Sequence, residues 1–277
     1  MVVPRALTST PMSPVTPPGG AGVRRLGRTG WRGLFLAKSA AGLIAFLANL
    51  YLARTLGGAE FGRYSFTIAT LTFLSFCFDF GFFASGARLL AVTDGELEMR
   101  GTLGAVWVLL GITSALFILV VLAAGAVMDW VFEDRIGPIL RTVAVLAPAM
   151  IAPFVVDQVL KACGRVYLYA SWIVLNKLLF LVALAVCGVL GSLTASTASA
   201  GYLGAGLAAL LYVGVAFPPR LSRIAPCIRE IAAEQRRFGS HLYAGKTANL
   251  LSYNLDKVLI AYFHGPLAVG CYSLAMN

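Results

Sequence analysis

Long apolar segments make up most of this chain, and they restrict it to very few architectures. A helix needs about 20 apolar residues to cross a bilayer; seven segments reach that length, and an eighth begins near residue 267. Strands of a membrane barrel would be about ten residues long and would alternate apolar with polar residues, which these segments do not. The sequence therefore predicts an all-α fold, a polytopic membrane helix bundle. The seven predicted spans are residues 34–53, 64–90, 102–127, 139–160, 167–190, 197–217 and 241–263.

The composition agrees with a membrane protein. Only 12% of the residues are charged and 59% are hydrophobic, whereas a soluble domain has about 25% charged residues. The formal net charge of +10 would suit a nucleic-acid-binding protein only if the basic residues formed one face of a water-exposed domain. The spans leave no room for such a domain, so we expect no nucleic-acid partner.

The positive charges near the span ends indicate the orientation in the membrane. Alternate ends carry 16 lysine and arginine residues on one side and four on the other. Because cytoplasmic connections hold the excess of positive charge, the sequence predicts a cytoplasmic N-terminus and a basic cytoplasmic loop at residues 218–240. Residues 1–33 are rich in proline, serine and glycine and lack apolar periodicity, which predicts a disordered cytoplasmic tail.

One helix-loop-helix corner occurs twice. The stretch LARTLGGAEFGRYSF at residues 52–66 aligns with IAYFHGPLAVGCYSL at residues 260–274, 208 positions later. The copies lie six spans apart, an even number, so both have the same orientation. This predicts a parallel repeat like that of some secondary transporters, with a first six-helix half at 34–217 and an incomplete second half at 241–277. The alternative is an accidental likeness of glycine-rich corners. The identical pairs are Ala53/Ala261, Gly57/Gly265, Gly62/Gly270, Tyr64/Tyr272 and Ser65/Ser273.

Four motifs, in this order, carry a resemblance to a known family. They are ARTLGGAEFGRY at 53–64, DFG at 79–81, NLDKVLI at 254–260 and GPLAVGCYSLA at 265–275. In these residues the chain resembles the polysaccharide biosynthesis family, the O-antigen and teichoic-acid type flippases of the multidrug/oligosaccharidyl-lipid/polysaccharide exporter superfamily.

The resemblance implies a flippase of the bacterial cytoplasmic membrane. Its substrate would be a lipid-linked oligosaccharide, attached through pyrophosphate to a polyprenyl chain, and it would need no cofactor. Membrane lipids and the glycosyltransferases or polymerase of the same pathway are the other expected partners. Family members have two complete halves, whereas this sequence stops just inside the second, so we expect either a fragment or a truncated gene product.

Charged residues inside the spans are the first candidates for substrate binding, because a charge at mid-bilayer costs about 2.5–3.5 kcal/mol on insertion scales. Counted at about 1.5 Å per residue, Lys177 and Asp79 both fall near mid-membrane. Two interpretations remain open. They pair with each other or with helix neighbours and lock helices together, or Lys177 faces a central cavity and attracts the pyrophosphate.

Five further residues complete the candidate set. Arg54 is expected at the outer end of the first span, as an interface anchor or an exit-side phosphate ligand. Lys38 and Arg88 are expected at cytoplasmic span ends, where they contact headgroups or an incoming phosphate. Asp256 and Lys257 are adjacent and cannot share a helix face. Asp256 is therefore a candidate cavity residue or proton site, while Lys257 extends to the interface.

Other patterns bear on the class of protein. Asp157 and Lys161, four apart with the acid first, are expected to form a structural pair on one helix face. His241 and His264 have no second ligand at a metal-binding spacing, so we expect no metal site. The chain has no P-loop, G-x-S-x-G or H-E-x-x-H motif, and we expect no enzyme. The open alternatives are a multidrug or cation exporter, a membrane-embedded transferase and a non-transporting scaffold.

Overall fold

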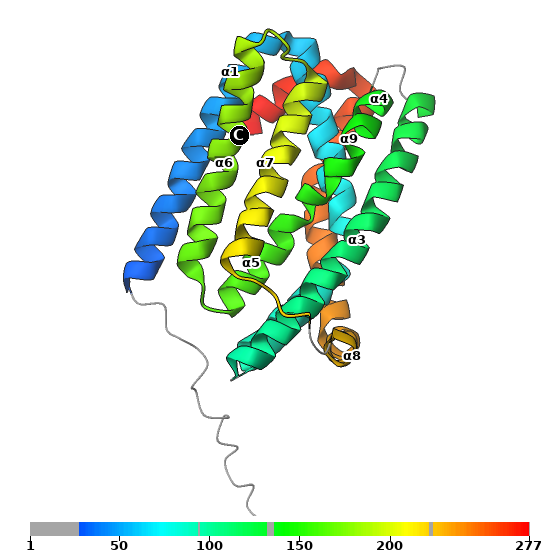
Figure 1. Ribbon diagram of the computed structural model, residues 1–277. Helices are drawn as coiled ribbons and strands as arrows, with labels where there is room; N and C mark the ends of the chain where they lie inside the picture. Colours follow the sequence, from blue (N-terminus) through cyan, green and yellow to red (C-terminus); the bar gives the residue numbers. More distant parts are fainter. Residues whose placement is uncertain (1–27, 94, 132–135, 222–223, 277) are drawn as a thin grey trace, which may run out of the picture.

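The computed structural model describes residues 28–93, 95–131, 136–221 and 224–276, and within these ranges some side chains, most of them after residue 246, lie outside the description. Every regular element in these ranges is helical, as Figure 1 shows. The elements are α1 (Arg28–Cys77), α2 (Phe82–Val92), α3 (Glu96–Val131), α4 (Ile136–Val143), the 3₁₀ helix η1 (Ala144–Met150), α5 (Ala152–Ala162), α6 (Val166–Val189), α7 (Ala195–Ala216), α8 (Ile224–Glu234), the π-helix η2 (Gln235–Gly239) and α9 (Ser240–Met276).

The chain is a multi-pass membrane helix bundle, which confirms the predicted fold class. Large apolar side chains lie on its outer faces, as lipid requires: Leu211 is 68% exposed and Val215 is 82% exposed. The interior is apolar as well, with Phe66, Phe83 and Phe117 fully buried. Five described stretches are long and apolar enough to cross a membrane: Arg32–Cys77, Glu96–Trp130, Ile136–Ala162, Val166–Val189 and Ala195–Ala216.

Two helices bend at glycines that occupy equivalent positions of the predicted repeat. α1 bends at Gly57, with φ 74° and ψ 169°, and α9 bends at Gly265, with φ 78° and ψ 175°. This combination of dihedral angles is essentially restricted to glycine. Each helix therefore consists of two arms, and α1 holds the first predicted span and the first part of the second. The two sequence corners thus share one backbone conformation, 208 positions apart, while the repeat of the two halves stays a prediction.

The two corners pack against each other. A Cβ atom built on Gly270 would lie 3.1 Å from the Cα atom of Gly62, its repeat equivalent. Ser65 and Ser273, also equivalent, are both buried. The second arm of α1 and α9 thus meet through the same positions of each copy, which is the contact expected near a two-fold axis of the repeat.

The bundle has two distinct ends, visible in Figure 1. The bend of α1 and the α6–α7 connection lie at one end, here called the corner end. The start of α1, the α5–α6 connection and α8 lie at the other, here called the α8 end. The sequence predicted one side of the membrane for the N-terminal tail and residues 218–240. The start of α1 and α8 do lie at one end.

The structure differs from the expected helices in four places. The predicted span 64–90 is broken between Cys77 and Phe82, where Phe80 has φ 44° and Gly81 has φ 75°. The span 139–160 contains η1, because Pro148 lacks the N–H that an α-helix needs there. Most of the connection 218–240 is helical, and its helix α8 buries Ile231 against the bundle. α1 begins at Arg28, so the last residues of the predicted tail are helical.

Candidate functional site

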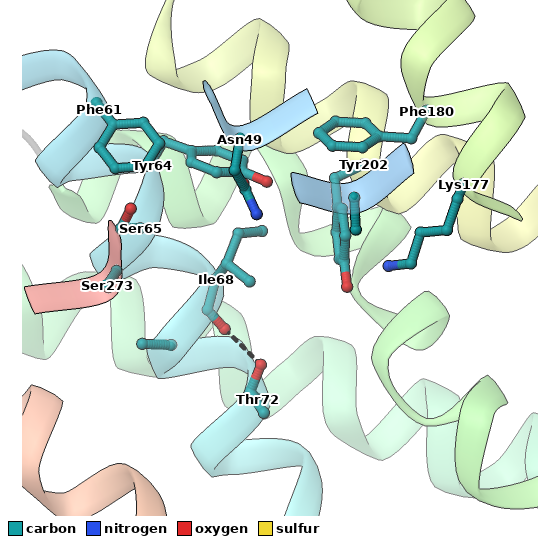
Figure 2. A pocket seen from close by; sticks show the side chains of 12 residues that line it. Asn49, Phe61, Tyr64, Ser65, Ile68, Thr72, Lys177, Phe180, Tyr202 and Ser273 are labelled. Atoms are coloured by element: carbon teal, nitrogen blue, oxygen red, sulfur yellow. Dashed lines mark hydrogen bonds between the residues drawn. The ribbon is translucent and has the colours of Figure 1, made fainter. Parts of the chain in front are cut away.

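A cavity of about 230 Å³ lies between α1, α6, α7 and α9, beside the two repeated corners. Both arms of α1 and the helices α6, α7 and α9 contribute to it. The lining residues are Ala45 and Asn49 from the first arm of α1, Phe61, Tyr64, Ser65, Ile68, Ala69 and Thr72 from its second arm, Lys177 and Phe180 from α6, Tyr202 from α7 and Ser273 from α9. Figure 2 shows these side chains around the open space.

Lys177 is the charged group of this lining. Its Nζ atom lies 5.1 Å from the centre of the Tyr202 ring, a cation–π contact, and in Figure 2 its side chain projects from α6 toward the hydroxyl end of that ring. The ring is fixed edge-on against Phe180, with centroids 5.2 Å apart and planes at 90°. Among the described residues, no acidic side chain lines the cavity, and no carboxylate lies within ion-pair distance of Lys177. The cavity therefore presents a positive charge that an anion can neutralise.

The remaining polar groups of the lining are neutral. Ser65 and Ser273 lie beside each other in Figure 2, although 208 positions separate them. Asn49 offers both donors and an acceptor, while the Thr72 hydroxyl donates to the Ile68 carbonyl at 2.7 Å. Hydroxyl and amide groups around one cation suit a polar anionic ligand, such as a phosphate ester. The cavity also receives a serine from each copy of the repeat.

Asp79 does not pair with Lys177, which was one of the possibilities that the sequence left open. The Asp79 carboxylate binds the Nζ atom of Lys246, with 2.6 Å between N and Oδ2. The arm of α1 between Gly57 and Cys77 is about 30 Å long at 1.5 Å per residue, the thickness of the hydrocarbon core. Asp79 therefore lies toward the α8 end of the span and away from its middle. Lys177 is left without a carboxylate among the described residues, which keeps it available to a ligand.

Three other candidates lie outside the cavity. Lys38 and Arg54 are exposed on the first arm of α1. Arg88 forms an ion pair with Glu234 at 2.7 Å, and its guanidinium carbon lies 4.6 Å from the centre of the Phe238 ring. Arg88 thus connects α2 to the helices at the α8 end. Its partners are protein groups, which is a third outcome beside the headgroup and the phosphate expected from the sequence.

The remaining charged residues considered in the sequence lie on α5 and α9. The Asp256 carboxylate accepts a hydrogen bond from the Tyr272 hydroxyl, which links the two arms of α9. The side chain of Lys257 lies outside the described residues. Asp157 and Lys161 form the expected pair on one face of α5, with 2.5 Å between Oδ1 and Nζ. Within the described ranges, no three His, Cys, Asp or Glu side chains cluster as a metal site would require.

A larger hollow of about 600 Å³ lies at the α8 end, between the start of α3 and α8. Its charged lining residues are Glu98, Arg220 and Glu230. Two carboxylates against one guanidinium make it a poorer anion site than the cavity around Lys177. None of the residues proposed from the sequence lines it.

Sequence reasoning missed several lining residues, each for a definite reason. Tyr202 stands in a glycine- and alanine-rich helix and gave no signal beyond close packing. Ser65 and Ser273 were recognised as identical positions of the repeat, and that identity was the signal that placed them at the interface between its copies. Lys246 was counted among the basic residues after the sixth span, and its partner Asp79 is 167 positions away.

Comparison with known protein families gives one match. The model of the family described as polysaccharide biosynthesis protein matches residues 28–277. This range includes both corners, the cavity and the ion pair between Asp79 and Lys246. No curated protein and no solved structure matches the chain.

Proposed function

The chain belongs to the polysaccharide biosynthesis protein family, and on this premise we propose that it is a flippase for a lipid-linked oligosaccharide. The substrate would be attached through pyrophosphate to a polyprenyl chain. It would pass from the inner to the outer leaflet of the bacterial cytoplasmic membrane, without covalent chemistry by the protein.

The observation that carries this proposal is the unpaired cation in the cavity. An ammonium group inside a membrane protein is costly, and it is retained where it serves a ligand or a partner. Lys177 has an aromatic ring as its neighbour, and no carboxylate among the described residues, so its charge is free to attract a diphosphate. A cation exporter would need acidic groups in the same place, and the described lining residues include none.

The size of the cavity limits which part of the substrate it takes. Pockets that enclose a whole ligand have about 300–1,000 Å³, and this cavity has about 230 Å³. We therefore assign the diphosphate linkage to it. The polyprenyl chain would remain in lipid beside the bundle, and the glycan would need the bundle to open.

The distribution of charge supports the orientation. With the α8 end in the cytoplasm, the side with 16 basic residues faces inward, in agreement with the positive-inside rule. A membrane potential that is negative inside then favours outward movement of the diphosphate. For about two uncompensated charges this contributes roughly 4 to 5 kcal/mol per 100 mV, at about 2.3 kcal/mol per charge.

Replacement of Lys177 tests the site directly. Lys177→Gln removes the charge and keeps a polar side chain of similar length, so export of the lipid-linked glycan should fall at least about tenfold, as expected for a lost charge contact of about 1.4 kcal/mol or more. Export is measured in cells at matched protein levels. Arg229→Gln is the matched control, because Arg229 is exposed on α8 and lies outside the cavity.

Two results would count against the proposal. Full export by Lys177→Gln would remove the cavity from the transport path. Equal loss of export by Arg229→Gln would show that general loss of positive charge, and not the position of Lys177, is responsible.

A further inference from the structure

The break between α1 and α2 is built around residues of η2 and α9. Tyr243 donates its hydroxyl to the Cys77 carbonyl at 3.0 Å, and Gln235 donates its amide to the Phe80 carbonyl at 3.1 Å. Both carbonyls belong to the segment where the helix is interrupted, so they need donors from elsewhere. A Cβ atom on Gly81 would lie 2.3 Å from the Gly239 carbonyl oxygen, which shows how closely the two segments approach.

Asp79 and Lys246 form the charged contact of this junction, and their surroundings differ. The Asp79 side chain is 4% exposed, whereas that of Lys246 is 33% exposed. One carboxylate oxygen, Oδ1, is buried without a hydrogen-bond partner. Lys246 also lies 4.9 Å from the centre of the Phe154 ring. The pair therefore has a fixed, buried acid and a base that still reaches the surface.

The pair lies on the line from the α8 end to the cavity. Thr72 lines the cavity, and α1 continues from it toward the α8 end for five more residues, to Cys77. Asp79 lies in the break that follows the end of α1, so the junction stands on the α8 side of the cavity. α9 contributes both Lys246 at the junction and Ser273 in the cavity. A ligand that moves along this interface from the α8 end meets Lys246 before it meets Lys177.

We propose that Lys246 is an entry site for the diphosphate group of the substrate, and that Asp79 occupies Lys246 while the site is empty. This inference rests on the proposed function and assigns a first contact that precedes Lys177. An ammonium group has three donors, and the exposed side of Lys246 leaves room for an anion to approach. Asp79 then acts as an internal competitor, because it and the diphosphate seek the same cation.

Competition between Asp79 and the diphosphate for Lys246 predicts the direction in which anion affinity should change. Asp79→Asn removes the competing negative charge and keeps the shape of the side chain, so Lys246 should bind an anion more tightly. A pair that merely holds two helices together predicts no such gain. The probe is inorganic pyrophosphate, titrated against the purified full chain in nanodiscs of neutral lipid, with binding measured by isothermal calorimetry.

We expect Asp79→Asn to increase the affinity for pyrophosphate roughly five- to tenfold. Lys246→Gln should lower it, and Asp79→Asn combined with Lys246→Gln should bind no better than Lys246→Gln alone. Asp157→Asn is the matched control. It removes the same charge from another Asp–Lys pair, with 2.5 Å between Oδ1 and Nζ, whose lysine also lies over an aromatic ring, that of Tyr169 at 5.1 Å. It should leave the affinity unchanged.

Three results would overturn the proposal. Unchanged or weaker binding by a folded Asp79→Asn variant would overturn the proposal, as would an equal gain from Asp157→Asn. If phosphatidylglycerol in the nanodiscs abolishes the part of the binding that depends on Lys246, the site belongs to a membrane headgroup and the proposal fails.

The outcomes also separate this inference from the proposed function. Pyrophosphate binding that depends on Lys177 but is indifferent to Asp79 and Lys246 would leave the flippase intact and remove only the entry site. Full glycan export by Lys177→Gln would remove the transport path itself.

Discussion

Gly62 and Gly270 are equivalent residues of the two corner copies, and they face each other across the interface between the second arm of α1 and α9. A Cβ atom on Gly270 would meet the Cα atom of Gly62 at 3.1 Å and its nitrogen at 3.3 Å. The contact joins backbone to backbone. It brings the serines of both copies to the same cavity.

Gly270→Ala should therefore weaken this contact. The added methyl group has no space without a shift of α9, and overpacking of this kind costs about 1–3 kcal/mol. Thermal unfolding of the purified protein measures the loss. Gly245→Ala on the same helix is the control, because nothing lies within 4 Å of its Cβ position. A gain or no change for Gly270→Ala would show that the two helices separate readily at this point.

Gly57→Ala and Gly265→Ala should each destabilise the protein through the backbone alone. Neither glycine has an atom within 4 Å of its Cβ position, but both have dihedral angles that cost other residues about 1–3 kcal/mol. Gly42→Ala, in the first arm of α1 and equally open, should be neutral or stabilising by up to about 1 kcal/mol. The unfolding temperatures of the three variants measure these differences in stability. Equal temperatures for Gly57→Ala and Gly42→Ala would contradict the prediction.

The ion pair between Asp79 and Lys246 should respond asymmetrically to substitution. Lys246→Met leaves the Asp79 carboxylate buried without a partner, which costs about 3–5 kcal/mol. Asp79→Asn should cost less, because Lys246 still reaches the surface. The double variant should be more stable than Lys246→Met. Chemical unfolding of the four proteins gives the coupling energy, and additive effects would show that the pair contributes little.

The more exposed pair of α5 provides a comparison. Asp157 and Lys161 have side chains that are 39% and 45% exposed, and pairs of that kind are worth at most about 1 kcal/mol. Lys161→Met should therefore destabilise the protein far less than Lys246→Met.

The proposed orientation predicts which thiols a membrane-impermeant maleimide reaches in intact cells. Thr55→Cys at the corner end should be labelled, and Arg229→Cys on α8 should be labelled only after the membrane is permeabilised. The background replaces the exposed Cys271 with serine. Burial raises the pKa of the Cys163 thiol to about 11, so it should remain largely protonated and unreactive near pH 7.5. The reverse labelling pattern would show that the chain has the opposite orientation in the membrane.

The sequence predicted the features that depend on local composition. Apolar length gave the membrane spans, and Gly57 with Gly265 identified the corners, because their backbone conformation requires glycine irrespective of neighbours. Lys177 was selected as a candidate because a charge within a span stands out, and the structure places it in a cavity. Its function as a ligand for phosphate stays a prediction.

The features that were missed depend on contacts between distant segments. The break at Asp79 is stabilised by donors from Gln235 and Tyr243, more than 150 positions away, and no pattern near residue 79 reveals them. Lys246 looked like one more basic residue of a cytoplasmic connection. The partner of Asp79 could not be predicted for the same reason, since depth along two spans says nothing about which helices are neighbours.

The bends at Gly57 and Gly265 also matter for sequence comparison. Positions of the two corners that accept many side chains differ, as Arg54 and Tyr262 do. A position whose backbone conformation is essentially restricted to glycine should keep its identity in both corners. These two glycines therefore supply a fixed register for aligning the two corners in related chains, even where every neighbouring residue has changed.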